Sequence, residues 1–174
     1  MLFKRYFINR ITRQAVKKSN VLRENISFKN AKSVGVIYTW EGKRKAEIIH
    51  DFENEMKLSG KKVKILCFSR VDLKMLLVKD DYFNEHDFHY LGKMKSNTLR
   101  NFTNSQFDFL FHLDTTENIY IENVMALSNA RCRVSRADKS KEALYDFMIR
   151  TKNGGIDKLC YEILYYTKSL VNNA

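Results

Sequence analysis

The chain has 174 residues, a length that suits one domain, and 44% of them are apolar, which argues against extensive disorder. Its formal net charge is +11, and most of that charge lies at one end. Residues 1–32 hold nine basic side chains against one acid, so this segment carries +8 and leaves +3 for the remaining residues. A basic segment beside a nearly neutral domain indicates a polyanionic partner, either nucleic acid or an anionic membrane.

The three cysteines also limit the class of protein. Cys67, Cys132 and Cys160 lie far apart and form no CxxC pair, which argues against a disulfide framework or a zinc site. They are more typical of buried thiols in a reducing compartment. No apolar run approaches the length of a membrane span, and no secretory signal is recognisable. We therefore expect a cytoplasmic protein that holds neither a metal nor a cofactor.

The first element in the chain is a predicted helix over residues 2–18, which contain no glycine, proline or acid. Apolar side chains recur at every fourth position on one stripe of this helix: Phe3, Phe7, Ile11 and Ala15. Four interpretations stay open. The helix docks on the domain by that stripe and its cations are merely solvated, or it contacts RNA or DNA phosphates, or it lies on an anionic membrane surface, or it is a mitochondrial presequence.

Strands and helices alternate after a polar linker at 19–32. The apolar patterns predict strands at 33–38, 62–68, 88–91, 107–113, 131–135 and 144–150, and helices at 43–58, 96–103, 119–129 and 156–171. Residues 71–78 fit either a short strand or a helical turn, and 80–85 read as a polar connection. Gly35, inside the first strand, is expected to permit the close approach of a helix.

This alternation predicts an α/β protein with a Rossmann-like three-layer fold, in which helices cover both faces of a mostly parallel sheet of five or six strands. The run 107–113 is apolar throughout, as expected for a central strand that is buried on both faces. Two parts follow from this reading: residues 1–32 as a basic helix and linker, and residues 33–174 as the α/β domain.

Ligands of open α/β sheets bind beyond the carboxyl ends of the strands. Polar residues that follow two predicted strands would meet at that edge and form a possible ligand pocket: Glu41, Asp114, Thr115 and Thr116. Glu41 and Asp114 would face each other as paired carboxylates. The simpler interpretation is that 114–116 cap the next helix, with Glu117 at its positive end, and that Glu41 is solvated.

Motifs of catalysis are missing from the sequence. Neither strand-to-helix turn carries a glycine-rich phosphate-binding fingerprint, and no serine stands in a nucleophile elbow. His112 precedes Asp114 by two residues, a spacing that suits a base oriented by a carboxylate but is more typical of a hydrogen-bonded core histidine. We assign no catalytic residue.

Two resemblances extend this reading. The chain resembles a family of small proteins from Bacteroidota that carries no established activity, through its basic N-terminal helix, the SVGVIY strand, the DFHYLGK segment and FDFLFHLDTTENIYIENVMALSNARCRVSR. Members of that family tend to have glycine where Ser135 stands. The strand–LD–helix–ALSNARCRV pattern is also similar to the acceptor-side half of heptosyltransferase-like glycosyltransferases. That similarity covers about thirty residues and implies a Rossmann-like half-domain without the half that binds the nucleotide-sugar.

The leading hypothesis is a non-enzymatic α/β module that binds RNA or the ribosome through the cations of its arm: Lys4, Arg5, Arg10, Arg13, Lys17 and Lys18. Tyr6 or Phe7 would stack on bases. The alternatives are a degenerate or partner-dependent glycosyltransferase-like enzyme that uses the Glu41 and Asp114 edge, and a scaffold that attaches to an anionic membrane surface by the arm.

Overall fold

A computed structural model of the chain describes residues 2–19, 26–76, 78, 80–151 and 154–170. Within these residues, six strands form one all-parallel sheet in the order β3-β2-β1-β4-β5-β6. The strands are β1 (Ser33–Thr39), β2 (Lys62–Phe68), β3 (Asp81–Phe83), β4 (Phe109–His112), β5 (Cys132–Arg136) and β6 (Phe147–Ile149). The strand order reverses between β1 and β4, and the predicted Rossmann-like α/β fold is confirmed.

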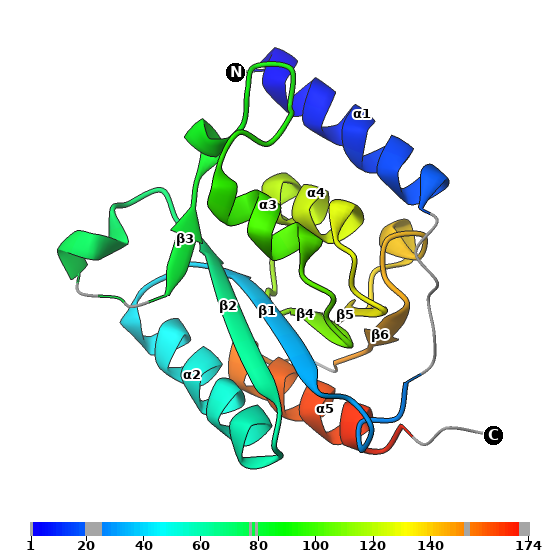
Figure 1. Cartoon of the computed structure of the whole chain (residues 1–174). Helices are drawn as coiled ribbons and strands as arrows, with labels where there is room; N and C mark the ends of the chain where they lie inside the picture. Colours follow the sequence, from blue (N-terminus) through cyan, green and yellow to red (C-terminus); the bar gives the residue numbers. More distant parts are fainter. Residues whose placement is uncertain (1, 20–25, 77, 79, 152–153, 171–174) are drawn as a thin grey trace.

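Helices cover both faces of this sheet, as Figure 1 shows. Helices α2 (Lys43–Leu58) and α5 (Ile156–Lys168) pack on one face. Helices α3 (Asn97–Asn104) and α4 (Ile119–Leu127) cover the other, and α1 (Leu2–Lys18) packs on α4. Three short 3-10 turns complete the elements: η1 (Leu73–Leu76), η2 (Glu85–Asp87) and η3 (Lys139–Lys141).

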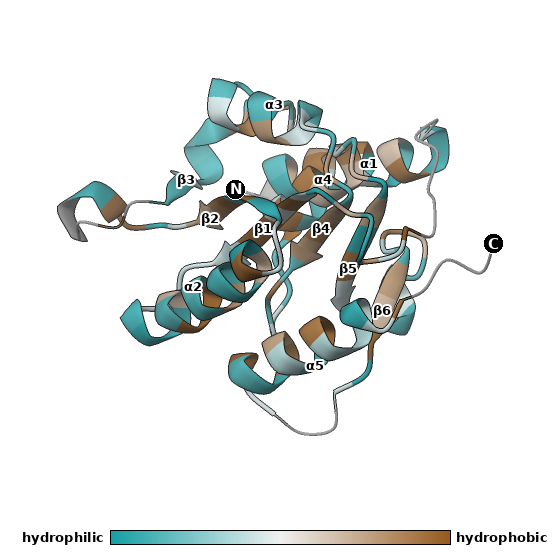
Figure 2. Cartoon of the chain, turned by 60° about the horizontal axis from the view of Figure 1, so that its bottom comes forward, coloured by the Kyte–Doolittle hydropathy of each residue, from teal (hydrophilic) through white to brown (hydrophobic). Residues whose placement is uncertain are grey.

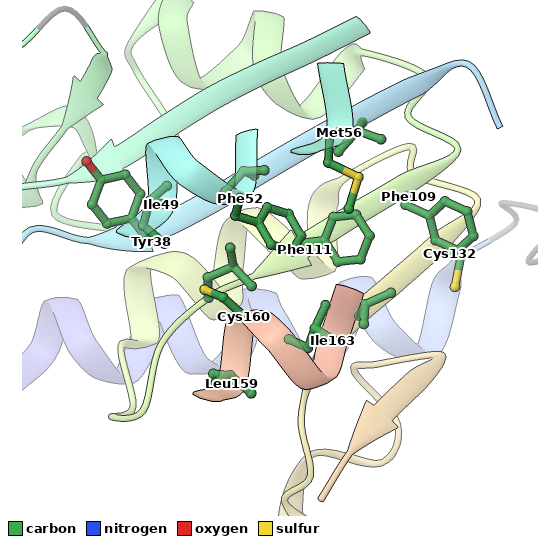
Figure 3. Close-up of a cluster of buried hydrophobic side chains, with 14 of the residues drawn as sticks. Tyr38, Ile49, Phe52, Met56, Phe109, Phe111, Cys132, Leu159, Cys160 and Ile163 are labelled. Atoms are coloured by element: carbon green, nitrogen blue, oxygen red, sulfur yellow. The ribbon is translucent and has the colours of Figure 1, made fainter. Parts of the chain in front are cut away.

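Each face of the sheet has its own apolar cluster. Between the sheet and helices α2 and α5, the ring of Phe52 meets Phe111 edge to face at 5.2 Å, and Ile163 and Cys160 close the cluster from α5 (Figure 3). Between the sheet and helices α3 and α4, the cluster includes Leu66, Leu99, Leu110 and Val124. The central strands β1 and β4 are therefore mainly apolar, and the helices are polar on their outer sides (Figure 2).

The predicted bounds of α2 and β2 agree with the structure, and two other segments have a different secondary structure from the predicted one. Residues 81–83 form the edge strand β3 where a polar connection was expected, because Phe83 and Tyr82 pack on opposite faces of the sheet while the strand pairs with β2. Residues 88–91 form no strand. Phe88 makes an isolated antiparallel bridge to Met94, and the chain turns at Gly92, whose φ is +78°.

Gly35 also has a different neighbour from the one expected. A Cβ at this position would lie 2.7 Å from Leu110 Cδ1 and 2.9 Å from the ring of Phe107. The residues that require glycine here therefore come from the β4 segment rather than from a helix.

The segment before β1 is more buried than a polar surface linker would be. Residues 20–25 of the predicted linker lie outside the described residues, but Ile26, Phe28 and Ala31 join the core. The ammonium group of Lys61 donates hydrogen bonds to the carbonyl oxygens of Phe28 at 2.7 Å and Ala31 at 2.6 Å. This contact fixes the segment to the start of β2.

Helix α1 docks on the domain by a face that includes only part of the predicted stripe. Ile8 is fully buried and Ala15 and Val16 pack beside it, whereas Phe3 is 82% exposed. The face is set by α4, because the side chain of Asn123 donates hydrogen bonds to the carbonyl oxygen of Ile8 and the hydroxyl of Thr12. Residues that recur every fourth position shift gradually around a helix of 3.6 residues per turn. The N-terminal end of this stripe therefore lies outside the face that contacts the domain.

Candidate functional site: a polar sheet edge and a basic helix face

Asp114, directly after β4, is the centre of the polar edge. The residue is 3% exposed, and its carboxylate accepts hydrogen bonds from the backbone N–H of Thr39 at 3.0 Å and from the Thr39 hydroxyl at 2.8 Å. Asp114 therefore terminates β1 and does not cap α4. The cap is Asn118, whose side-chain oxygen accepts from the Tyr120 N–H at 3.0 Å and whose amide group donates to Thr39 Oγ1.

Lys45, in the first turn of α2, connects the two predicted carboxylates. Its Nζ donates to Asp114 Oδ1 at 2.6 Å and to Glu41 Oε1 at 2.9 Å, and the side chain is 5% exposed. Glu41 and Asp114 are thus bridged by an ammonium group and do not form the predicted carboxylate pair. The i,i+4 spacing of Glu41 and Lys45 was the one signal in the sequence that pointed to this contact.

His112 joins the same buried network. Its Nε2 lies 3.1 Å from Asp114 Oδ2, and its Nδ1 lies 2.7 Å from the hydroxyl of Tyr145. Burial raises the pKa of Asp114, but the hydrogen bonds from His112 and Lys45 outweigh it and hold that pKa below the ordinary value. Burial also raises the pKa of Tyr145. These buried polar groups are hydrogen-bond partners of one another, so the network holds the ends of β1 and β4 together at the sheet edge.

A cavity of about 360 Å³ lies beside this network, at the carboxyl ends of β1 and β2. It is the place where ligands bind in folds of this strand order. Glu41 and Thr116 contribute to its wall, whereas Asp114 and Thr115 do not. Its other walls are Thr39, Trp40, Phe68, Arg70, Val71, Glu117 and Asn118. Across the described residues, no group of three or more His, Cys, Asp or Glu side chains is placed to hold a metal ion.

The second candidate feature is the outer face of α1. Tyr6, Arg10, Arg13 and Lys17 follow one another at i, i+4, i+7 and i+11, which places them on one side of the helix, opposite the buried Ile8. All four are exposed, and α1 contains no acidic residue. None of the three cations forms an ion pair with a described residue. A shallow groove of about 340 Å³ follows this row, with Asn9 and Gln14 on its sides.

The six cations predicted for the arm are therefore not equivalent. Arg10, Arg13 and Lys17 make up the outward row, and Arg5 and Lys18 are exposed on its flanks. Lys4 turns inward and donates a hydrogen bond to the carbonyl oxygen of Glu85, and its burial lowers its pKa. The structure thus groups three of the six with Tyr6.

In the described part of the chain, no helix combines the length and the apolar character that crossing a bilayer requires. No curated protein matches the sequence. A family model does match, over residues 4–170, and its description is a family of unknown function, DUF6913. Because this match spans most of α1 as well as the whole sheet, the chain belongs to the DUF6913 family.

Proposed function

We propose that this protein is an RNA-binding α/β module that uses the outer face of α1 and carries out no catalysis itself. The observation that carries the proposal is the row of Tyr6, Arg10, Arg13 and Lys17 on the side of α1 opposite its docked face. We expect it to act in the cytoplasm, on RNA or on the ribosome.

The dimensions of the row suit a nucleic-acid backbone. A helix rises about 1.5 Å per residue, so Arg10 and Lys17 are separated by about 10 Å along the axis, with Arg13 between them. Three cations over that length can neutralise successive phosphates of one strand. Tyr6, 61% exposed at the N-terminal end of the row, supplies a ring on which a base can stack.

The docking of α1 favours RNA over a membrane surface. An interfacial helix binds lipid by burying an apolar face among the acyl chains. In this structure the face that holds Ile8, Ala15 and Val16 is packed against the α3 and α4 side of the domain. The face that remains is polar along most of its length, so it can attract an anionic surface but has little apolar area to insert.

The test is the affinity for single-stranded poly-uridine, measured by fluorescence anisotropy with wild-type protein and an Arg10→Gln, Arg13→Gln, Lys17→Gln variant. The proposal predicts that the variant loses roughly a hundredfold in affinity at about 0.1 M salt, because three phosphate contacts are removed. The matched control is Lys29→Gln, Lys43→Gln, Lys139→Gln, which removes the same charge from exposed positions elsewhere. An equal loss of affinity in both variants would show that only the net charge of the protein matters, and it would contradict the proposal.

The membrane alternative is separated by flotation with anionic vesicles. Binding to vesicles without binding to poly-uridine would replace RNA with a lipid surface as the partner.

A second candidate function rests on the cavity at the sheet edge. Trp40 and Phe68 give it aromatic walls, and Glu41 and Glu117 give it carboxylates, a combination that suits a sugar. This is the position that a partner-dependent glycosyltransferase-like enzyme would use. A thermal-shift screen with nucleotide-sugars and free sugars tests it, since a ligand raises the melting temperature by mass action. No shift with any of them argues against this candidate.

A further inference from the structure

The outer edge of β2 is only partly covered. β1 pairs with β2 along all seven residues, from Lys62 to Phe68. On the other side, β3 pairs only with Leu66, Cys67 and Phe68. Residues 62–65 therefore form an edge with which no described strand pairs. Figure 1 shows this part of β2 extending beyond the point where β3 begins.

The register identifies the backbone groups at this edge. The N–H of Lys62 donates to the carbonyl oxygen of Lys32, on the β1 side, and the N–H of Ser69 donates to Phe83, on the β3 side. Backbone groups alternate in direction along a strand, so the odd-numbered residues Val63 and Ile65 point their N–H groups outward, away from β1. These are the groups that an added strand would use.

A groove of about 690 Å³ lies along this edge, with β2 residues 64–66 at its base. One wall comes from α2 through His50, Glu53 and Lys57, and the other comes from α3 through Thr98, Asn101 and Phe102. Its volume falls within the roughly 300–1,000 Å³ of typical ligand pockets. The groove thus offers space between two helices, directly beside the unpaired backbone groups of β2.

The charges of the groove differ between its two ends. Asp80 and Asp81 lie where β3 begins, and Asp81 is exposed there. Lys64 is exposed further back along β2, and Lys57 stands in the last turn of α2, close to the start of that strand. Lys64 Nζ is 3.2 Å from the Ser105 hydroxyl, and Lys57 pairs with Glu53 at 2.6 Å.

We propose that this groove binds an extended peptide segment of another protein by β-strand addition to residues 62–65 of β2. The segment runs antiparallel to β2, with a basic residue or amino terminus at Asp81 and an acidic residue at Lys64. A second copy of β2 fits poorly, because pairing the strand with itself would bring Lys62 and Lys64 close to the same lysines of the other copy. This inference does not depend on RNA binding by α1.

The test begins with a random library of short peptides displayed on phage and selected on the immobilised protein. The proposal predicts enrichment of peptides in which an acidic residue follows a basic residue after about two positions, with β-branched residues around them, because only Ile65 separates Lys64 from the residue that pairs with Asp81. A synthetic copy of a selected peptide is then titrated against wild-type protein by fluorescence anisotropy.

Two changes remove the backbone pairing without touching side-chain charge. Val63→Pro deletes an N–H that faces the groove and leaves the pairing with β1 in place, as proline allows on an edge strand. N-methylation of alternate amides in the peptide removes the N–H groups with which the peptide would pair to β2. Each is expected to weaken binding by about tenfold or more, the equivalent of about 1.4 kcal/mol.

Lys64→Glu is expected to change the preference of the selected peptides from an acidic to a basic residue at that end, and Lys139→Glu, on the exposed η3 turn, serves as its control. If Val63→Pro lowers the stability of the fold, the affinity of the N-methylated peptide for wild-type protein is the measurement that tests the proposal. The proposal is overturned if no peptide is enriched, or if N-methylation leaves the affinity unchanged.

Discussion

The side-chain amide nitrogen of Asn123, at the centre of α4, lies 3.0 Å from the hydroxyl oxygen of Thr12 in α1. Asn123 is fully buried, and its amide also reaches the carbonyl oxygen of Ile8. These contacts fix the rotation of α1 about its own axis. The outward direction of Arg10, Arg13 and Lys17 follows from them, so the fold itself determines which cations a polyanion can reach.

Gly92 tests the docking of α1 directly. Its φ is +78°, and a Cβ there would lie 2.8 Å from the backbone nitrogen of Ile8. We expect Gly92→Ala to cost more than the roughly 1–2 kcal/mol of a left-handed alanine, because α1 must also move away. Urea unfolding measures the cost, and faster tryptic cleavage within residues 2–18 reports the movement.

Gly60 provides the matched control, since it has the same φ of +78° and no atom within 4 Å of an added Cβ. Gly60→Ala should show the backbone cost alone and leave cleavage of α1 unchanged. Equal behaviour of the two variants would mean that Gly92 has no role in holding the helix.

The Asp114 network predicts a dependence of stability on pH. The pKa of this carboxyl is lowered in the fold, so its contribution is present above the unfolded pKa of about 3.9 and is lost as pH falls through the folded pKa. At pH 7, Asp114→Asn should cost about 3–5 kcal/mol, because it leaves the buried ammonium of Lys45 without its main partner.

Urea unfolding at neutral and acidic pH should therefore show the difference between wild type and Asp114→Asn narrowing as the pH is lowered. Asp51→Asn, at an exposed position of α2, is the control and should change the free energy of unfolding by little at any pH. A difference for Asp114→Asn that stays constant down to acidic pH would contradict the network.

Lys61 is expected to stabilise the segment before β1. Lys61→Met removes the hydrogen bonds to the carbonyl oxygens of Phe28 and Ala31, and we expect a loss of about 1–3 kcal/mol in chemical unfolding. Lys62→Met replaces the exposed neighbour and should change stability by less than about 0.5 kcal/mol. Similar losses for the two variants would show that the carbonyl contacts add nothing.

The cysteines supply a probe of the intact core. Cys67, Cys132 and Cys160 are all buried, as predicted, and burial raises the pKa of Cys67 and of Cys160 to about 12. We expect no alkylation by iodoacetamide in native protein at mildly alkaline pH and full alkylation in urea. A Ser140→Cys variant should react at once, since that position is exposed. Rapid native labelling of wild type would contradict the packing around α5 and β5.

The sequence was sufficient to predict those elements whose apolar residues follow one period. The inward residues of α2, Ala46, Ile49, Phe52 and Met56, are those that the helical spacing indicates. β3 escaped prediction because three residues are too few to show a period. The rotation that buries Ile8 and exposes Phe3 depends on Asn123 of α4 and on Gly92, which are distant in the chain, so the local pattern could indicate only part of the docked face.

The polar edge shows the same limit. Its position after β1 and β4 was predictable, because ligands of open α/β sheets bind beyond the carboxyl ends of the strands. The role of Asp114 was not, because a short polar residue between a strand and a helix usually caps the helix, and here Asn118 does so instead. Only the three-dimensional structure places Lys45 between Glu41 and Asp114.

The measurement that bears most directly on the central claim is the salt dependence of binding to single-stranded poly-uridine. For single strands, each neutralised phosphate contributes about 0.7 to the slope of log affinity against log salt concentration. The account predicts that the Arg10→Gln, Arg13→Gln, Lys17→Gln variant has a slope about 2 smaller in magnitude than that of wild type, while the Lys29→Gln, Lys43→Gln, Lys139→Gln variant keeps the wild-type slope. Equal slopes for all three proteins, or no measurable binding by wild type, would contradict it.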